Sequence, residues 1–261
     1  MLDDGQGGEI DNPITTTNTF SRRRALQHTA ALSSGFVLLP TTSVLAADDT
    51  TATPSTTSIS PIATLSDGSK FPLASFGLQI YDDNTAYKLT LTALECGYRN
   101  FFASVLAGNQ RGFAKAVRDS GIDRKELYIC GSVVSNRVAG YDAALKETTK
   151  GWKRNMEAFA AGNIDYLDQI MLDYPGPDCK SIQGQWKSFE DMYQQGLTKS
   201  LSVSNFSPAQ LDCVLQTAKV AKPVVNQLPY SVAYHPGNSI AENKQRDILV
   251  QAWAPLGGSL G

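Results

Sequence analysis

The residues that could perform acid–base or metal chemistry are few. Asp165, Asp168 and Asp173 lie close together in the sequence and carry the oxygen donors that a hard cation prefers. Asp165 should start a strand and only Asp173 should reach its far end, so the three carboxylates should not converge, and we predict no metal site. Tyr98 and Tyr174 could donate a proton, but the sequence places no lysine beside either hydroxyl to make it a stronger acid.

The cysteines are far apart in the sequence. Cys96, Cys130, Cys179 and Cys213 form no C-x-x-C pair, so neither a zinc site nor a thioredoxin-like dithiol is indicated. Cys130 falls in an apolar run that should be buried. An even number of cysteines permits disulfides in an exported protein, but we expect four unreactive thiols.

The composition excludes several classes of protein. The chain has 261 residues, 18% of them charged and 42% hydrophobic, with 23 Lys and Arg against 25 Asp and Glu. Without a basic excess, we predict no nucleic-acid partner and no attraction to anionic lipid. No apolar run reaches the roughly 18 residues that a membrane-spanning helix needs. We therefore expect a soluble protein without a transmembrane segment once its N-terminal signal is removed.

Residues 1–47 resemble a twin-arginine export signal. Three arginines at positions 22–24 precede a weakly apolar stretch over 30–45, which ends in V-L-A-A at 44–47. Such signals carry folded proteins into a bacterial periplasm or a thylakoid lumen. A chance basic start to an Ala/Leu/Ser-rich helix is the alternative. Residues 48–60 have almost no apolar side chains, which predicts a Thr/Ser-rich linker before a folded domain over 61–261.

Beyond residue 61, apolar strands alternate with amphipathic helices. A D-G turn predicts a hairpin over 64–71. The expected strands are 73–78, 98–102, 127–134, 166–172, 201–203, 224–226 and 248–254, and the expected helices are 85–95, 110–119, 141–160, 186–195 and 208–219. This alternation predicts an α/β fold, a (β/α)8 TIM barrel. Because the chain ends at Gly261, just after the seventh strand, we expect the barrel to lack its C-terminal part, from strand eight onward.

Six short motifs carry a resemblance to a known family. They are G-Y-R at 97–99, I-D-Y-L-D at 164–168, P-G-P at 175–177, V-S-N-F at 203–206, V-N-Q at 225–227 and W-A-P-L-G at 253–257. Each is weak alone, but in this order and at barrel-like spacing they resemble an aldo-keto reductase, from residue 64 to the end of the chain. The resemblance implies a (β/α)8 barrel of a family that reduces carbonyls with NADPH.

The resemblance also shows that the family's catalytic residues are replaced. In the family, a Tyr protonates the alkoxide that hydride transfer forms, a Lys activates this Tyr, an Asp holds the Lys and a His orients the carbonyl. The matching positions of Asp, Tyr, Lys and His are here Phe102, Ala107, Ser132 and Asp173. A small shift of the alignment does not restore them, because no lysine lies between Lys125 and Lys146 and His235 is the only histidine beyond the signal.

The cofactor side of the family's site is better kept. In the family, a Ser-Asn pair and a Gln hold the nicotinamide carboxamide, and an aromatic ring stacks on the nicotinamide. The matching residues are Ser204, Asn205, Gln227 and Trp253, and the loop 257–261 offers backbone N–H groups to a pyrophosphate. The resemblance implies NADP(H) as cofactor, bound weakly or lost, because the residues with which the family binds the adenosine follow strand eight. Alternatively, the polar residues persist only as hydrogen-bonding groups at the barrel mouth.

Three functions are open from the sequence. The first, which we favour, is a pseudo-reductase that binds a nucleotide or acts as a scaffold for a larger protein complex in an exported compartment. Loss of the acid–base residues and an apolar Phe101-Phe102 pair at the barrel mouth support it. The second is an active NADP(H)-dependent oxidoreductase that reduces aldehydes or ketones with another proton donor, such as Tyr174 or water. The third is a damaged or decaying copy of a reductase.

Overall fold

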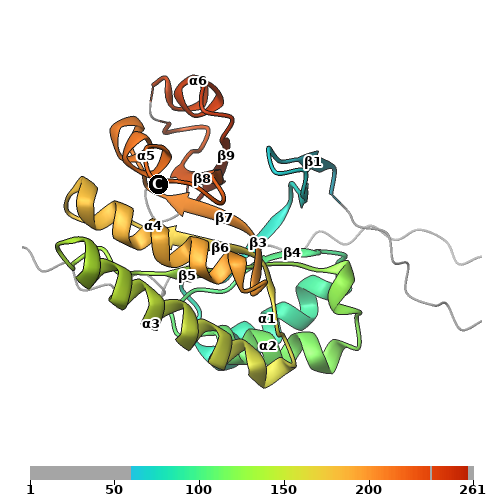
Figure 1. Ribbon diagram of the computed structural model, residues 1–261. Coiled ribbons are helices and arrows are strands. Elements are labelled where there is room, and N and C mark those ends of the chain that lie inside the picture. The colour runs from blue at the N-terminus through green and yellow to red at the C-terminus, as the bar shows by residue number, and fades with distance from the viewer. Residues whose placement is uncertain (1–59, 236, 258–261) are drawn as a thin grey trace, which may run out of the picture. The chain divides into compact units, whose positions relative to one another are not determined.

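The computed structural model describes residues 60–235 and 237–257 (Figure 1). The chain divides into two compact units, Met1–Thr53 and Pro54–Gly261, and all described residues belong to the second. The export signal predicted over 1–47, nearly all of the linker predicted over 48–60 and most of the loop 257–261 lie outside the described residues.

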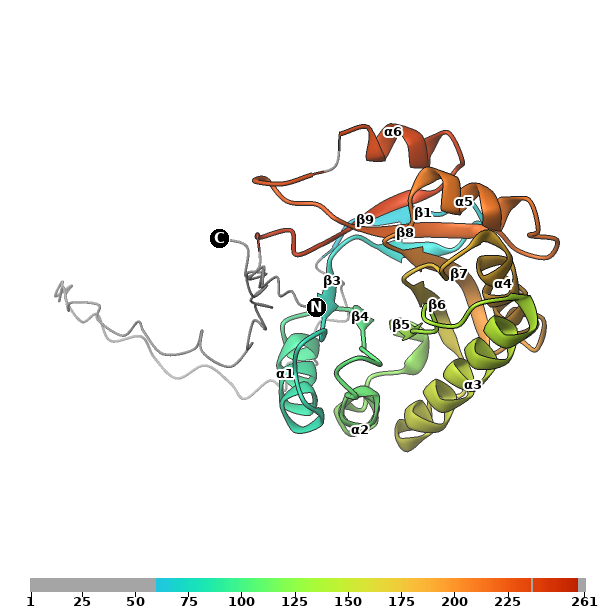
Figure 2. The ribbon, with the colours of Figure 1, turned by 90° about the vertical axis from the view of Figure 1, so that its left-hand side faces the viewer.

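A seven-stranded parallel sheet forms the centre of the fold. Its spatial order, β3-β4-β5-β6-β7-β8-β9, equals the chain order, as right-handed strand–helix–strand crossovers produce. The strands are β3 (Ser75–Gly77), β4 (Asn100–Phe102), β5 (Tyr128–Val133), β6 (Leu167–Asp173), β7 (Thr198–Ser204), β8 (Pro223–Pro229) and β9 (Leu249–Trp253). Figure 2 shows the sheet curling into an open half-barrel, with β3 and β9 as its edges among the described residues. The prediction of a TIM-type barrel is confirmed for the seven strands of the described residues.

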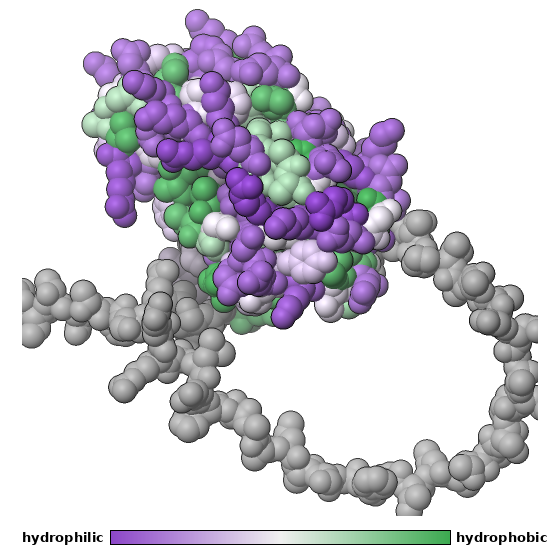
Figure 3. Space-filling view, turned by 90° about the horizontal axis from the view of Figure 1, so that it is seen from below, coloured by the Kyte–Doolittle hydropathy of each residue, from purple (hydrophilic) through white to green (hydrophobic). Residues whose placement is uncertain are grey.

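Helices cover the outer face of the sheet (Figures 1 and 2). They are α1 (Asp83–Glu95), α2 (Gln110–Ser120), α3 (Tyr141–Phe159), α4 (Cys179–Gln194), α5 (Pro208–Leu215) and α6 (Ser239–Lys244), with short 3-10 turns at Arg124–Glu126 and Ala160–Gly162. Their inner sides bury large apolar residues such as Phe113, Phe159 and Trp186 against the strands. The face seen from below in Figure 3 is mostly hydrophilic, as expected of side chains that point away from this core. No helix in the described ranges is long and apolar enough to span a bilayer.

The structure corrects the sequence prediction at three helices. The fourth helix begins at Cys179 rather than at residue 186, because the Asp178 side chain accepts a hydrogen bond from the Ser181 amide at 2.8 Å and caps the helix. The short helix α6 was not predicted, and the fifth helix ends at Leu215 rather than at residue 219.

A hairpin closes the amino-terminal end of the half-barrel. Its antiparallel strands are β1 (Ile62–Thr64) and β2 (Lys70–Pro72), joined by the predicted turn, in which Gly68 has φ +85°. Phe71 packs edge-on against Tyr128 of β5 with 5.2 Å between ring centroids, and Ser200 of β7 donates to Asp67 at 2.6 Å. Because this end is covered, the carboxyl ends of the strands are where a site can be open to a ligand.

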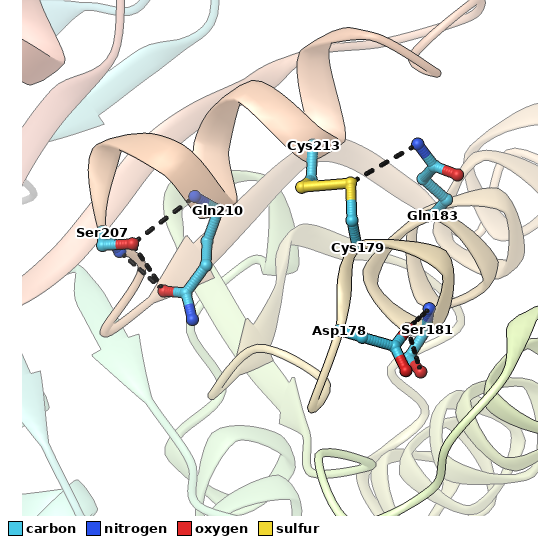
Figure 4. The surroundings of a disulfide bond; sticks show 7 residues. All are labelled: Asp178, Cys179, Ser181, Gln183, Ser207, Gln210 and Cys213. Atoms are coloured by element: carbon cyan, nitrogen blue, oxygen red, sulfur yellow. Dashed lines mark hydrogen bonds between the residues drawn. A yellow bond between two sulfur atoms is a disulfide. The ribbon is translucent and has the colours of Figure 1, made fainter.

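The expectation of four unreactive thiols is wrong for two of them. Cys179, at the start of α4, and Cys213, in α5, form a disulfide with 5.4 Å between their Cα atoms (Figure 4). The two residues are 34 positions apart and meet only because α4 and α5 pack side by side, which local sequence spacing does not show. Cys130 is a buried free thiol and Cys96 an exposed one.

Candidate functional site

The strand register brings the candidate cofactor residues to one edge of the sheet. Asp173, the last residue of β6, pairs with Ser204, the last residue of β7, and Ser204 pairs in turn with Gln227 of β8. Trp253 ends β9 beside Pro229. Since parallel strands end on the same side, these residues form a continuous arc at the open end of the half-barrel.

A chain of hydrogen bonds joins four strands of this arc. The Trp253 indole N–H donates to Asn205 Oδ1 at 3.2 Å, and Asn205 Nδ2 donates to Ser204 Oγ at 2.9 Å and to Asp173 Oδ1 at 3.4 Å. Asn205 has φ +63°, a left-handed conformation that asparagine tolerates better than most residues, and its backbone N–H donates to the Gln227 carbonyl at 2.9 Å. The amide of Asn205 is therefore the centre of the cluster.

Asp173 is the ionisable member of the cluster. Its side chain is buried, and this burial raises the pKa of the carboxyl from its usual 3.8 to about 6, although hydrogen bonds from Ser204 and Asn205 favour the anion. The group is neutral in a large fraction of molecules near pH 6 and mostly anionic at neutral pH. The cluster thus places a negative charge among the residues predicted to contact the nicotinamide.

The cofactor candidates differ in what their side chains contact. Trp253 is 36% exposed, so this residue is accessible to a ligand. Ser204 is buried within the cluster. Gln227 donates from Nε2 to Gln251 Oε1 at 3.0 Å rather than to Asn205 or Ser204. The structure therefore brings Ser204, Asn205 and Trp253 together, with Gln227 joined to them through the backbone.

The remaining tetrad positions carry no acid or base. Phe102 is buried against Cys130 and Met171 inside the half-barrel. Ser132 is fully buried, and its hydroxyl accepts a hydrogen bond from the Val105 amide at 3.5 Å. Ala107 lies in the turn that follows β4 and is partly exposed. These three positions supply no side chain that ionises near neutral pH.

The predicted apolar pair at the barrel mouth is half right. Phe102 faces the barrel interior, whereas Phe101 points to the other face of the sheet, where its ring lies 5.6 Å from that of Phe113 in α2. Neighbouring residues of a strand face opposite sides, so only one of the two could have lined the interior.

An open cavity of about 680 Å³ lies beside the cluster, on the loops that follow β4, β5 and β6. It is lined by Leu106, Val134, Ser135, Asn136, Arg137, Val138, Glu147 and Tyr174. The sequence reasoning named only Tyr174 of these. The loop after β5 could have been found from its position, because the loops at the carboxyl ends of barrel strands are where ligands bind.

Asp168 belongs to the opposite end of β6. Its carboxylate pairs with the Arg124 guanidinium at 2.7 Å and with the Lys199 ammonium at 3.1 Å, and both cations lie over the ring of Tyr166. Asp168 and Asp173 are thus separated by the length of a strand, and Asp168 has a structural role.

Comparison with known proteins identifies the family. Residues 73–260 match the sequence model described as the Aldo/keto reductase family. The chain belongs to the aldo-keto reductase family. Glyoxal reductase of Bacillus subtilis is 30% identical over 207 residues, which cover 77% of this chain and 69% of the relative. The 9,11-endoperoxide prostaglandin H2 reductase of Trypanosoma cruzi is 28% identical over 165 residues, and the chain spans only 54% of its length.

Solved structures of aldo-keto reductases share the fold. An aldo/keto reductase from Brucella melitensis superimposes with a TM-score of 0.69 at 26% identity, covering 76% of this chain and 74% of the other. The Bombyx mori aldo-keto reductase, solved in complex with NADP, superimposes with a TM-score of 0.66 over 77% of this chain and 69% of its own. At 20% identity this second likeness concerns the fold alone.

Proposed function

We propose that this aldo-keto reductase family member is a pseudo-reductase: it holds NADP(H) through Ser204, Asn205, Gln227 and Trp253 but does not carry out the family's carbonyl reduction. The observation that carries the proposal is a contrast within one site. The hydrogen-bonded cluster of Trp253, Asn205 and Ser204 is assembled, whereas three of the four tetrad positions, Phe102, Ala107 and Ser132, hold no ionisable side chain.

The cluster fits a nicotinamide ring. The bond from the Trp253 indole to Asn205 restrains the orientation of the ring, and the residue is 36% exposed, which supports stacking by a ligand. The amides of Asn205 and Gln227 and the Ser204 hydroxyl supply both donors and acceptors for a carboxamide. When bound, a reduced nicotinamide supplies a hydride.

The same geometry disfavours reduction. A carbonyl that receives a hydride becomes an alkoxide, and a donor must neutralise it. Ser132 is a buried neutral hydroxyl, and above pH 6 Asp173 is an anion that would repel the developing negative charge rather than stabilise it. Among the described residues, the cluster thus supports the orientation of a nicotinamide, whereas Phe102, Ala107 and Ser132 supply no proton for the alkoxide.

An active oxidoreductase with another proton donor is the second candidate. Tyr174 is 40% exposed on the wall of the cavity and directly follows Asp173, whose carboxyl can carry a proton near pH 6. With Asp173 as the donor, the reductase would work best in mild acid, where this carboxyl carries its proton.

An aldehyde and ketone screen distinguishes the two candidates. NADPH consumption is followed below and above pH 6 for the full chain, with the Tyr174→Phe and Asp173→Asn variants as matched controls. We expect no consumption above that of the buffer at either pH. Saturable consumption that either variant removes would replace the pseudo-reductase proposal with the active one.

We also propose export by the twin-arginine route to a periplasm or thylakoid lumen, where the protein would serve as a nucleotide-binding or scaffold component of a larger complex. The sequence of residues 1–47 supports this, and so does the Cys179–Cys213 disulfide, because disulfides persist mainly in oxidising compartments. NADPH is not regenerated there, which agrees with a binding role rather than turnover.

A further inference from the structure

We propose that the Cys179–Cys213 disulfide is a redox-sensitive clip that holds the loop carrying Ser204 and Asn205 in its nucleotide-binding position. Reduction would loosen this loop and weaken NADP(H) binding. The effect on affinity rests on the proposed function, whereas the effect on the loop does not.

The disulfide joins the two strand–helix units that build the cluster. Cys179 is the first residue of α4, which follows β6 and its terminal Asp173, and Cys213 lies in α5, which follows β7 and Asn205 (Figures 1 and 4). Asn205 donates to Asp173 between the same two units at the barrel mouth. The disulfide therefore joins the β6–α4 unit to the β7–α5 unit through their helices. In the site, the same two units are joined by the hydrogen bond of 3.4 Å between Asn205 and Asp173.

The helix α5 is too short to be stable without tertiary contacts. It has 8 residues, fewer than the roughly 12 that an isolated helix needs even for marginal stability. Its other anchors are a capping box between Ser207 and Gln210, the buried Leu211 and Val214, and an ion pair from Asp212 to Arg246 at 2.8 Å.

The helix is connected almost directly to the site. Only Phe206 and Ser207 separate Asn205 from the first residue of α5. Phe206 is buried, and its backbone carbonyl accepts from Asn226 Nδ2 at 2.9 Å. With so short a connection, a shift of α5 changes the position of the Asn205 amide that contacts Trp253, Ser204 and Asp173.

A reductant can reach the bond from outside the barrel. Both cysteines are half-buried, and the bond joins two helices of the outer layer. Cys179 occupies the first turn of α4, where the helix N-terminus stabilises negative charge, and Gln183 Nε2 lies 3.6 Å from its sulfur. Cys179 is thus the sulfur that leaves more readily.

The reaction is an ordinary exchange with a dithiol. One dithiol sulfur attacks Cys213 Sγ, the S–S bond breaks and Cys179 leaves as a thiolate, which takes a proton. The second dithiol sulfur then attacks the mixed disulfide and releases Cys213. The protein disulfide gains two electrons and two protons to become two thiols, and the dithiol is oxidised to a cyclic disulfide.

Hydrogen exchange of the full chain tests the clip. Amides of residues 205–215 are compared in the oxidised protein, after treatment with dithiothreitol, and in the double variant Cys179→Ser/Cys213→Ser. We expect reduction to speed exchange severalfold in this segment and not in α3. The double variant should exchange like the reduced protein, and dithiothreitol should not change its exchange rates. Cys96→Ser, which removes an exposed free thiol, should respond as the wild type does. Unchanged exchange over 205–215 would overturn the proposal.

NADPH affinity of the same samples tests the link to the site. We expect binding to weaken by about fivefold or more on reduction, a usual size for coupling between two sites. Equal affinity of the oxidised and reduced forms would overturn control of the site. If neither form bound NADPH, both the proposed function and the control of affinity by the disulfide would fail. The exchange data would still decide whether the disulfide orders the loop.

Discussion

Replacing Asp173 by asparagine removes a buried charge and keeps the shape of the side chain. In the folded protein burial holds the carboxyl protonated up to about pH 6, whereas in the unfolded chain it ionises near 3.8. Between these two values the folded state binds a proton that the unfolded state has lost, so stability falls as pH rises from about 4 to 6 and remains lower above it. At 1.36 kcal/mol per pKa unit, the full cost at neutral pH is about 3 kcal/mol.

The variant should therefore be more stable than the wild type, and only at pH values at which the Asp173 carboxyl of the wild type is ionised. We expect Asp173→Asn to raise the free energy of unfolding by up to about 3 kcal/mol above pH 7 and to leave it unchanged near pH 4. Urea unfolding followed by circular dichroism at both pH values measures the difference. The asparagine oxygen can still accept the hydrogen bond from Asn205.

Asp168→Asn is the matched control. It removes a carboxylate that pairs with Arg124 and Lys199, so it should destabilise the protein at neutral pH by leaving the partly buried Arg124 guanidinium without its partner. If Asp173→Asn instead destabilised the protein at neutral pH as Asp168→Asn does, the carboxylate of Asp173 would be a favourable partner, and our reading of its environment would be refuted.

Two further predictions concern the disulfide and the N-terminus. Cys179 and Cys213 enclose a loop with a sequence separation of 34, so Cys179→Ser/Cys213→Ser should lower the free energy of unfolding by about 4 kcal/mol relative to the oxidised protein, measured by urea unfolding, while Cys96→Ser should have little effect. An equal midpoint for the double variant and the wild type would mean that the two cysteines are not bonded. A reporter fused after residue 60 should be exported in a bacterium with a twin-arginine translocase, and Arg22→Lys with Arg23→Lys should retain it in the cytoplasm. Export that persists in the double variant would contradict the twin-arginine assignment.

Much of the architecture could be predicted because each strand and long helix has a local signal. The helix expected over 141–160 occupies Tyr141–Phe159, since its apolar residues recur with the helical period. The start of α4 was missed for a physical reason. Gly184 interrupts the helical signal, yet a Cβ atom there would lie 2.1 Å from the Tyr141 carbonyl, so the glycine allows α4 to pack closely against α3.

The sequence predicted which residues lie at the candidate site but not the hydrogen bonds between them. Position in a motif placed Asn205 and Trp253 at the barrel mouth, but the hydrogen bond between them joins residues 48 positions apart and depends on how β7 and β9 end. The burial that shifts the Asp173 pKa, and the meeting of Cys179 with Cys213, are likewise products of tertiary packing. The sequence pattern of a single helix or strand predicts neither the shifted pKa nor the disulfide.

A titration of the full chain with NADPH, followed by tryptophan fluorescence, tests the central claim most directly. Trp152 and Trp186 are buried in the helical layer and Trp253 alone of the three is substantially exposed, so a stacking nicotinamide should quench Trp253. We expect saturable quenching with a Kd below about 1 mM, equivalent to a binding free energy near −4 kcal/mol, and its loss in Trp253→Ala. No saturable response up to that concentration, or an equal response in Trp253→Ala, would contradict nucleotide binding at this site.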